Sequence, residues 1–268
     1  MFATLFPSDC RLCSAPLIKI SRLPVCETCL AEMRPIDGLI CAICGERLVS
    51  QFDIAPTDGV ARCGNCERSA PLFERAAAYG SYDAGLRDLI HLLKYEQVRP
   101  AAKVLGRMLA EGGSVLTEHF SSPPMMVPVP LHGSKLRQRG FNQAELIARE
   151  ALKYGMLPGV SPQLNAGVPE RCRPTESQTG LTRPQRRENI RGAFQVCHPE
   201  LVVGREILLV DDVFTTGTTV SECARILKRA GATKVFVATV ARVLKAESTF
   251  VEPDWDLAED PLALAARV

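Results

Sequence analysis

The chain has 268 residues, of which 46% are hydrophobic and 23% are charged. This composition is typical of a globular protein with one sizeable core and a small extra module, and it excludes a chain dominated by a disordered tail. The 32 Lys and Arg residues nearly balance the 30 Asp and Glu residues, so the formal charge of +2 predicts no general attraction to nucleic acid.

The distribution of charged and apolar residues along the chain is more informative than the overall composition. Residues 127–194 contain 11 basic and 5 acidic residues, whereas residues 244–268 contain 2 basic and 6 acidic residues and form an acidic tail that we expect to be flexible. The uncharged apolar stretches fall far short of the roughly 20 residues of a membrane helix, so we expect no membrane insertion. Residues 1–7 do not resemble a secretory signal, and we therefore expect a cytoplasmic protein.

Cysteines dominate the first part of the chain. Eight of the eleven precede Glu67, in four Cys-x-x-Cys pairs: Cys10/Cys13, Cys26/Cys29, Cys41/Cys44 and Cys63/Cys66. Two-residue spacing turns both thiolates of a pair toward one ion, and two pairs complete a tetrahedral site of four cysteines. The pattern predicts two structural Zn²⁺ sites rather than disulfides or a redox pair. Sequential pairing of the four motifs is favoured, and interleaved pairing stays open.

The three remaining cysteines are isolated in the sequence. Free cysteines are usually buried and inert, and we expect this of all three members of the group, which are Cys172, Cys197 and Cys223.

A second domain is predicted to begin near Pro71, where the composition changes. Residues 76–82 read as a strand, residues 83–95 as an amphipathic helix and residues 98–112 as a second helix ended by two glycines. An apolar run over 125–130 predicts a strand that stops at its prolines and leads into a loop over 131–139.

This predicted loop is cationic. It holds Lys135, Arg137 and Arg139 before Gly140, and a helix then begins near Asn142. A strand end, a basic loop and a helix start together predict an anion-binding pocket. A capping box formed by Asn142 and Glu145 would explain those two residues without any function. A polar, basic stretch over 171–189 is either a solvated loop followed by a short helix capped at Thr182, or part of the site.

The most informative segment is ILLVDDVFTTGTT, residues 207–219. Four aliphatic residues predict a strand buried on both faces, and residues 221–229 predict an amphipathic helix closed by Gly231. The loop between them therefore lies at a helix N-terminus, where free N–H groups, hydroxyls and a tight glycine turn suit a phosphate monoester. Asp211 and Asp212 suit a ribose diol, directly or through Mg²⁺, although a solvated strand end is the simpler alternative.

This segment resembles the phosphoribosyl pyrophosphate (PRPP) motif of phosphoribosyltransferases. Together with Leu93-Lys94-Tyr95, VPVPLHGSKLRQRGFNQ at 127–143 and TESQTGLTRPQRRENIRGAF at 175–194, it resembles the ComF/GntX family. The resemblance spans most of residues 5–243 and implies a double zinc ribbon over 1–70 joined to a type I phosphoribosyltransferase domain over 71–243. That fold is α/β, with a parallel twisted sheet flanked by helices; the tail over 244–268 lies outside the resemblance.

The resemblance also implies residue roles. Residues 175–189 would form a mobile cover, and Arg139, Arg183, Arg186 and Arg187, with the two aspartates, would act on the transition state. Binding of PRPP, or of a phosphoribosylated nucleotide, with Mg²⁺ would fall to Asp211, Asp212, Thr215, Thr216, Gly217, Thr218, Thr219, Lys135, Arg137, Arg139, Gly140 and Asn142.

Two functions are compatible with this resemblance. The first is a phosphoribosyltransferase with an unknown acceptor, in a protein concerned with DNA uptake or utilisation. The alternative is a catalytically inactive adaptor of the same fold that binds single-stranded DNA or a DNA-uptake helicase. Intact carboxylates and phosphate loops favour the first function. A stacking DNA binder should interleave aromatic with basic residues, and the basic region holds only three aromatic residues, Phe141, Tyr154 and Phe194.

Overall fold

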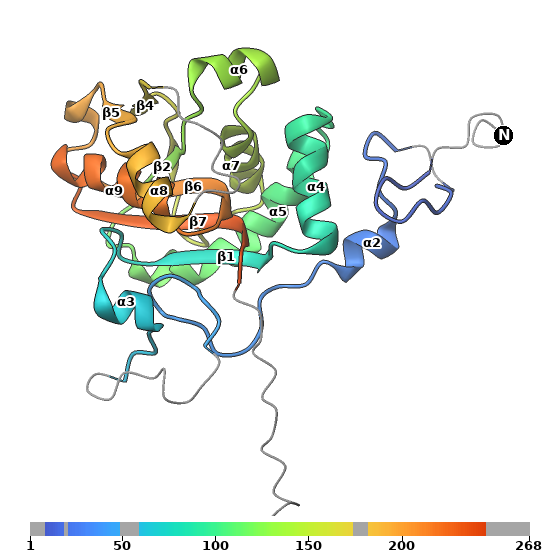
Figure 1. Ribbon diagram of the computed structural model, residues 1–268, viewed down its shortest axis with the longest axis horizontal. Coiled ribbons are helices and arrows are strands. Elements are labelled where there is room, and N and C mark those ends of the chain that lie inside the picture. Colours follow the sequence, from blue (N-terminus) through green and yellow to red (C-terminus); the bar gives the residue numbers. More distant parts are fainter. Residues whose placement is uncertain (1–8, 19–20, 49–58, 174–181, 245–268) are drawn as a thin grey trace, which may run out of the picture.

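The structure is a computed structural model that describes residues 9–18, 21–48, 59–173 and 182–244. Its centre is a five-stranded sheet in the order β1-β7-β6-β2-β3, in which every neighbouring pair is parallel (Figure 1). The strands are β1 (Ala76–Ser81), β7 (Lys234–Arg242), β6 (Glu206–Phe214), β2 (Met125–Pro128) and β3 (Gln163–Leu164). The predicted α/β class, with a parallel sheet flanked by helices, is confirmed.

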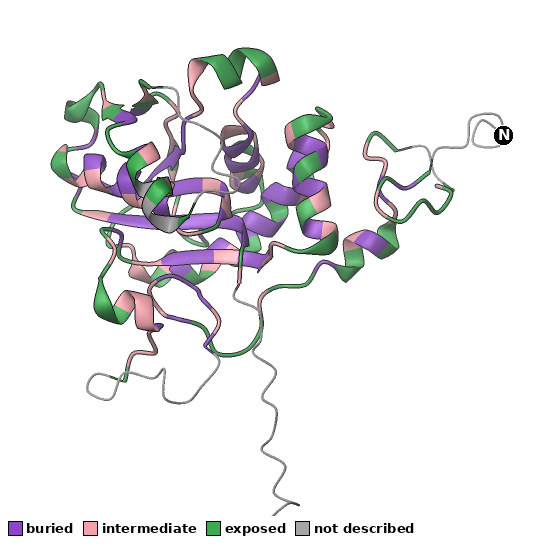
Figure 2. Ribbon diagram, in the orientation of Figure 1, coloured by how far each residue is buried: buried purple, intermediate pink, exposed green. Residues whose placement is uncertain are grey.

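Helices cover both faces of this sheet. One face carries α4 (Ala84–Tyr95), α5 (Ala101–Gly113) and α7 (Gln143–Lys153), and the other carries α9 (Thr218–Arg229) with α8 (Arg183–Ile190) beside it. Side chains of β6 alternate between them: Leu208 and Val210 join the α5 side, and Ile207 and Leu209 join the α9 side. The sheet is therefore the buried middle layer of three (Figure 2).

The strand order fixes where a ligand site can lie. The connection from β6 to β7 runs through α9 on one face, whereas the connection from β2 to β3 runs through α7 on the opposite face. Strands β2 and β6 are neighbours, so the loops at their carboxyl ends turn away from each other. Open α/β sheets bind ligands in the crevice that such a reversal leaves.

The remaining elements surround this sheet. A hairpin of β4 (Pro169–Arg171) and β5 (Phe194–Val196) pairs antiparallel and contacts α9. A short helix, α6 (Gly133–Arg139), follows β2, and the 3-10 turns are η2 (Ser114–His119) and η3 (Pro199–Leu201). In the N-terminal part the helices are α2 (Glu27–Glu32) and α3 (Gly64–Arg68). None of the helices in the described ranges is both long and apolar enough to cross a membrane.

Two boundaries differ from the sequence prediction. Helix α5 starts at Ala101 rather than at 98, and it runs through both glycines directly into η2. The glycines serve close packing instead of ending the helix, because a Cβ at Gly112 would lie 2.6 Å from the backbone of Tyr79. Strand β2 ends at Pro128 rather than at 130, although Val129 N still donates to Val210 O at 2.8 Å.

The N-terminal part covers the open edge of the sheet. Strand β1 is an edge strand, and its outer side pairs with the chain between the first and last cysteine motifs: Ile36 N donates to Tyr79 O, and Ala76 N donates to Ile43 O, both at 2.7 Å. Unpaired edge groups invite association with other strands, so this cover satisfies them.

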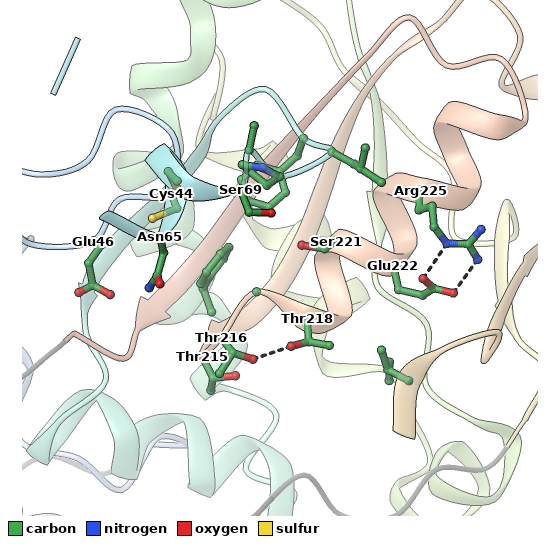
Figure 3. A pocket seen from close by; sticks show the side chains of 18 of the residues that line it. Cys44, Glu46, Asn65, Ser69, Thr215, Thr216, Thr218, Ser221, Glu222 and Arg225 are labelled. Carbon is green, nitrogen blue, oxygen red and sulfur yellow. Dashed lines mark hydrogen bonds and ion pairs between the residues drawn. The ribbon is translucent and has the colours of Figure 1, made fainter. Parts of the chain in front are cut away.

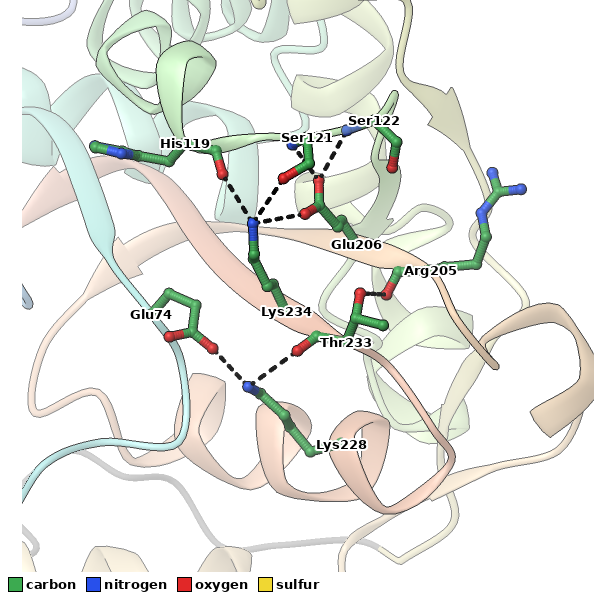
Figure 4. A network of polar contacts seen from close by, with 9 residues as sticks. All are labelled: Glu74, His119, Ser121, Ser122, Arg205, Glu206, Lys228, Thr233 and Lys234. Atoms are coloured by element: carbon green, nitrogen blue, oxygen red, sulfur yellow. Dashed lines mark hydrogen bonds and ion pairs between the residues drawn. The ribbon is translucent and has the colours of Figure 1, made fainter.

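At the amino ends of β6 and β7, charged side chains fasten the sheet to its loops (Figure 4). Glu206 is 5% exposed; it pairs with Lys234 at 2.9 Å and accepts from Ser121 N at 2.8 Å and Ser122 N at 3.2 Å. On α9, Lys228 pairs with Glu74 at 2.6 Å. This network lies at the end of the sheet opposite the carboxyl ends, where the candidate site forms.

Candidate functional site

The eight clustered cysteines form two groups of four. Cys10, Cys13, Cys26 and Cys29 make the first group, and Cys41, Cys44, Cys63 and Cys66 make the second; within each group all sulfurs lie within 4.8 Å of one another. The sequential pairing predicted from spacing is confirmed, and the interleaved alternative is excluded.

The sulfur spacing fits zinc. A tetrahedral ion with Zn–S bonds of about 2.3 Å holds its four sulfurs about 3.8 Å apart. The Sγ–Sγ distances are 3.9 Å for Cys10–Cys29, 3.7 Å for Cys13–Cys26 and 3.6 Å for Cys44–Cys63. Four thiolates leave no open coordination position, which is the arrangement of a structural rather than a catalytic zinc site.

The two groups differ in their surroundings. All four cysteines of the second group are at least half-buried, whereas Cys13 of the first group is exposed. At Cys10, burial acts to raise the pKa, but N–H donors from Cys26, Cys13 and Leu12 outweigh it and lower the pKa to about 6. A thiolate is therefore favoured at Cys10 near neutral pH, whereas burial and the neighbouring thiols of the same group raise the pKa of Cys29.

The strand that carries the aspartates is longer than predicted. Strand β6 continues through Asp211 and Asp212 to Phe214, and α9 begins at Thr218, so the connecting loop is only residues 215–217. Gly217 adopts a φ of +73° and forms the N-cap of α9. Thr218 and Thr219 accordingly belong to the first helical turn, and the start of a helix is a place where backbone N–H groups can bind an anion.

Hydroxyls complete this phosphate loop, which we define as residues 215–219. The Oγ1 atoms of Thr216 and Thr218 lie 2.7 Å apart, and Thr215 is exposed. The hydroxyls and the positive end of a twelve-residue helix together favour a phosphate group.

Because successive side chains of a strand point to opposite faces, the two aspartates meet different partners. The Asp212 carboxylate pairs with Lys94 Nζ at 2.7 Å, on the α4 side, and both side chains are largely buried. Burial acts against the Lys94 cation, but the Asp212 carboxylate outweighs it and raises the pKa of Lys94. Asp212 is thus held in place by a cation that lies far away in the sequence.

Asp211 faces the α9 side, near Arg171 and Cys223. Burial and the neighbouring Asp212 carboxylate raise the pKa of Asp211 to about 7, and Lys94, the Asp212 N–H group and Arg171 oppose this rise. Its Oδ1 atom accepts from Asp212 N at 2.9 Å. A carboxylate that is partly exposed and poised near neutrality suits binding of a diol or of a Mg²⁺ ion.

The predicted cationic loop over 131–139 is instead largely helix α6, which His132 caps at its start and Gly140 ends with a φ of +76°. Its basic residues are therefore spread around a short helix. Burial lowers the pKa of Lys135, and repulsion by Arg171, Arg139 and Lys94 lowers it further, so these cations act on one another electrostatically. Arg137 instead turns back toward Gly133 at the start of α6.

Asn142 has a clear structural role. Its Oδ1 atom accepts from Ala144 N at 3.1 Å, and its Nδ2 atom donates to Val129 O at 3.0 Å. The side chain thus caps α7 and ties it to the loop after β2. The other half of the expected capping box is replaced by an ion pair between Glu145 and Arg149 at 2.6 Å.

Near the carboxyl ends of β2 and β6, the Lys94–Asp212 pair and Asp211 therefore lie within electrostatic range of further cations, Lys135, Arg139 and Arg171. Lys135 and Arg139 were predicted from the sequence, whereas Lys94 and Arg171 were not assigned a role. Arg139 stacks on Tyr95, 5.6 Å from the ring centre, and its Nη1 donates to Gln143. Two carboxylates can bind a sugar diol, and the cations can hold an adjacent pyrophosphate.

The predicted mobile cover is described only in part. Residues 175–181 lie outside the described residues, and so do the side chains of Arg183 and Arg187. Arg186 is half-buried on α8, with its N–H donating to Thr182 O at 2.9 Å. The acidic tail over 245–268 is likewise outside the described residues.

The isolated cysteines differ from expectation. Cys223 is buried on α9, as predicted, but Cys172 and Cys197 are exposed, so the prediction for these two was wrong. Both lie at the ends of the short β4–β5 hairpin, which is too small to enclose a side chain at its ends.

Comparisons with known proteins agree with this geometry. Residues 1–70 match the double zinc ribbon domain family, and residues 173–261 match the phosphoribosyl transferase domain family. The DNA utilization protein YhgH of Escherichia coli K12 is 32% identical over 242 residues, which cover 89% of this chain and 98% of the relative. This chain is a member of the ComF/GntX family.

Other relatives of this family member carry related names. Competence protein F of Haemophilus influenzae is 27% identical, with 84% of this chain and 93% of the relative covered. Competence protein ComFC of Bacillus subtilis is 24% identical, with 77% of this chain and 79% of the relative covered. A solved phosphoribosyltransferase of Corynebacterium diphtheriae shares 19% identity over 59% of this chain and 92% of its own, with a TM-score of 0.31.

Proposed function

We propose that this protein binds PRPP together with Mg²⁺ in the crevice between the loops that follow β2 and β6. The observation that carries the proposal is that Asp211 and the Asp212–Lys94 ion pair lie at the carboxyl end of β6, where the strand order reverses and directly before the phosphate loop. Lys135, Arg139 and Arg171 add positive charge within electrostatic range. A ligand with a phosphate, a diol and a pyrophosphate matches these three sets of groups in number and sign.

In this proposal each group has a distinct task. The phosphate loop holds the 5-phosphate, Asp211 and Asp212 bind the ribose hydroxyls, and the cations from α4, α6 and β4 face the pyrophosphate. Asp211 and Asp212 would hold Mg²⁺, and the ion would supply positive charge beside the pyrophosphate.

Phosphoribosyl transfer is the chemistry that this arrangement favours. Displacement of pyrophosphate at the anomeric carbon passes through a cationic sugar, which nearby carboxylates stabilise, while Lys135, Arg139 and Arg171 stabilise the departing negative charge. Arg183, Arg186 and Arg187, on α8 and next to the predicted cover, are proposed to assist when the cover closes. The acceptor of the phosphoribosyl group is left open.

Calorimetric titration of the zinc-loaded protein with PRPP and Mg²⁺ tests the proposal. We expect saturable binding that weakens at least tenfold in an Asp211→Asn/Asp212→Asn variant, because two charged ligands are lost. Asp37→Asn is a suitable control, since Asp37 is 98% exposed and belongs to the linker between the cysteine groups. Absence of binding by the wild type at millimolar PRPP, or equal binding by the double variant, would contradict the proposal.

The names of the relatives favour a role connected with DNA, which we propose as the biological setting in the cytoplasm. As a second candidate, the same fold serves as an adaptor for single-stranded DNA or a DNA-uptake helicase, with basic residues of region 127–194 contacting phosphates. Fluorescence anisotropy with labelled single strands would separate the two. Salt-sensitive DNA binding that PRPP does not displace favours the adaptor, and PRPP binding without DNA binding favours the transferase.

A further inference from the structure

Arg242, the last residue of β7, is a buried cation at the border between the second cysteine group and the sheet. Only 4% of it is exposed. Its Nη2 atom donates to Cys44 Sγ at 3.5 Å and to Glu46 Oε2 at 3.2 Å. A single guanidinium nitrogen therefore contacts both a predicted zinc ligand and the next carboxylate along the chain.

The same guanidinium contacts the residue that precedes the phosphate loop. It stacks on Phe214, with Cζ 4.4 Å from the ring centre. Arg242 and Phe214 are also register partners of the β6–β7 pairing, and Val243 N donates to Phe214 O at 2.9 Å. Any displacement of Arg242 is thus transmitted to the ring and backbone of Phe214.

Phe214 in turn supports Gly217. A Cβ placed on Gly217 would lie 2.5 Å from the Cζ atom of the Phe214 ring, so the ring tip lies directly beneath the turn of the phosphate loop. Phe73 holds the ring from another side in an edge-to-face contact, with ring centres 6.0 Å apart. The chain of contacts runs without a gap from Cys44 through Arg242 and Phe214 to Gly217.

Charge makes this chain of contacts depend on the metal. Four thiolates and one Zn²⁺ ion carry a net charge of about −2, which a buried guanidinium neutralises in part. The Nε and Nη1 atoms of Arg242 have no hydrogen-bond partner among the described residues, so Cys44, Glu46 and Phe214 account for the hydrogen bonds and ring contact that hold it there. Without the metal, the thiols of the second group are no longer held around one ion, and the contacts that fix Arg242 weaken.

The second cysteine group and the phosphate loop also face one another across a cavity of about 990 Å³ (Figure 3). Cys44, Glu46 and Asn65 line one side, and Thr215, Thr216 and Thr218 line another. The position of the second cysteine group therefore shapes the space beside the phosphate loop. The same group also supports that loop through Arg242.

We propose that Arg242 is a positioning residue that couples the second zinc site to the phosphate loop. Metal binding by Cys41, Cys44, Cys63 and Cys66 then strengthens binding of the phosphorylated ligand at residues 215–219, and the ligand strengthens metal binding by the same factor. The inference rests on the proposed function, because the coupling is measured through the binding of PRPP.

The first cysteine group provides an internal comparison. It contacts the fold through α4, where Leu12 and Met33 lie against Gly85, and Tyr79 Oη donates to Met33 O at 3.0 Å. Cys10 and Cys29 of this group pack in the apolar cluster that contains α4, whereas Phe214 packs in the other cluster, with Cys41 and Cys44. Loss of the first metal site should therefore leave the phosphate loop in place.

The experiment compares PRPP affinity, by calorimetry with Mg²⁺, in the wild type, Cys66→Ser and Cys13→Ser. We expect Cys66→Ser to weaken PRPP binding roughly fivefold or more, which is the lower range of coupling between linked sites, and Cys13→Ser to leave it unchanged. Zinc release to a coloured chelator is then followed in Cys13→Ser, where the second site is intact. At equilibrium with the chelator, saturating PRPP should raise the zinc affinity of this protein by the same factor.

Arg242→Gln supplies the decisive variant. We expect a 10–100-fold loss of zinc affinity, as is usual for groups that contact a metal ligand, and loss of the mutual effect of zinc and PRPP. If this variant does not fold, the effect of PRPP on zinc binding in the Cys13→Ser protein decides whether the two sites are coupled. PRPP binding that is identical with and without metal in the second site overturns the coupling and leaves the proposed function intact. No PRPP binding by the wild type overturns both.

Discussion

At position 217 the chain needs a residue without a side chain, for two separate reasons. The backbone has a φ of +73°, and the space a Cβ would occupy is taken by the Phe214 ring. Because Phe214 and Gly217 are three residues apart, the loop folds onto the end of its own strand. The close approach leaves the N–H groups at the start of α9 facing outward, which is the condition for binding a phosphate.

Gly217→Ala should therefore lower the unfolding free energy by more than the change in backbone conformation alone would. We expect a loss of about 2–4 kcal/mol of unfolding free energy, from a left-handed alanine plus an overpacked contact. PRPP affinity should fall at least tenfold as the loop shifts. Urea unfolding and calorimetry measure the two effects.

Gly38→Ala is the matched control for this variant. Gly38 has a φ of +84°, and no atom lies within 4 Å of the Cβ that it lacks, so only the backbone cost of about 1–2 kcal/mol applies. Equal destabilisation by the two substitutions would show that the Phe214 contact is unimportant.

Residue-scale prediction from the sequence succeeded where the signal is local. The Cys-x-x-Cys spacings predicted both groups of four cysteines, and the run Asp-Asp followed by Thr and Gly predicted a buried strand that turns at Gly217 into a helix. The Lys94–Asp212 pair was not predicted, because nothing in the sequence near either residue refers to the other. Arg242 was likewise missed, since a basic residue at a strand end normally faces water and its burial depends on the ribbon folding over it.

At the scale of elements, capping explains why the segment after β2 is helical. His132 accepts from Ser134 N at the start of α6, and Gly140 ends the helix in the left-handed conformation. A helix of seven residues is too short to show a periodic apolar pattern, so the sequence read as a loop. The difference matters for the site, because the helix directs Lys135 and Arg139 toward Lys94 and Arg171 and directs Arg137 away.

Glu206 fixes the amino end of β6 to the loop before β2, and its substitution by Gln should destabilise the sheet. The side chain serves two backbone N–H groups and Lys234 at once, so we expect a loss of about 1–3 kcal/mol at pH 7 from groups left without their acceptor. Urea unfolding measures the difference.

The effect should depend on pH in a defined direction. Burial acts to raise the pKa of Glu206, but Lys234 and the N–H groups of Ser121 and Ser122 lower it below its ordinary value of 4.5. A lowered folded-state pKa gives stability that is present above pH 4.5 and is lost as the pH falls through the folded-state pKa. The gap between wild type and Glu206→Gln should therefore narrow below pH 4.5, and a gap that is constant with pH would contradict this account.

At the scale of the whole molecule, the two cysteine groups are unequal. The second shares one apolar cluster with the sheet, in which Cys41, Cys44 and Leu48 join Phe73 and Ala76. The first joins the other apolar cluster, in which Cys10, Cys29 and Met33 pack with Tyr79 and Leu86, and it lies at the outer end of the N-terminal part (Figure 1). The Cys-x-x-Cys motifs do not distinguish the two groups. Only the three-dimensional arrangement shows which one covers the edge of the sheet.

This cover leads to a prediction about shortened chains. Removing residues 1–70 leaves the outer side of β1 without Ile36 and Ile43 as hydrogen-bond partners and exposes Phe73 and Ala76. An exposed edge strand and an uncovered apolar patch favour association between copies. We therefore expect the shortened protein to self-associate and to lose unfolding free energy relative to the full chain, as measured by light scattering and urea unfolding.

A chain that begins at residue 35 is the matched control, because it lacks the first cysteine group but keeps Ile36, Ile43 and the whole second group. It should stay monomeric if the full chain is monomeric, and it should keep PRPP affinity, since Arg242 and Phe214 retain their contacts. Self-association of both shortened chains would assign the protective role to the first group. Association of neither would show that β1 needs no cover, and the second ribbon would then act on the phosphate loop alone.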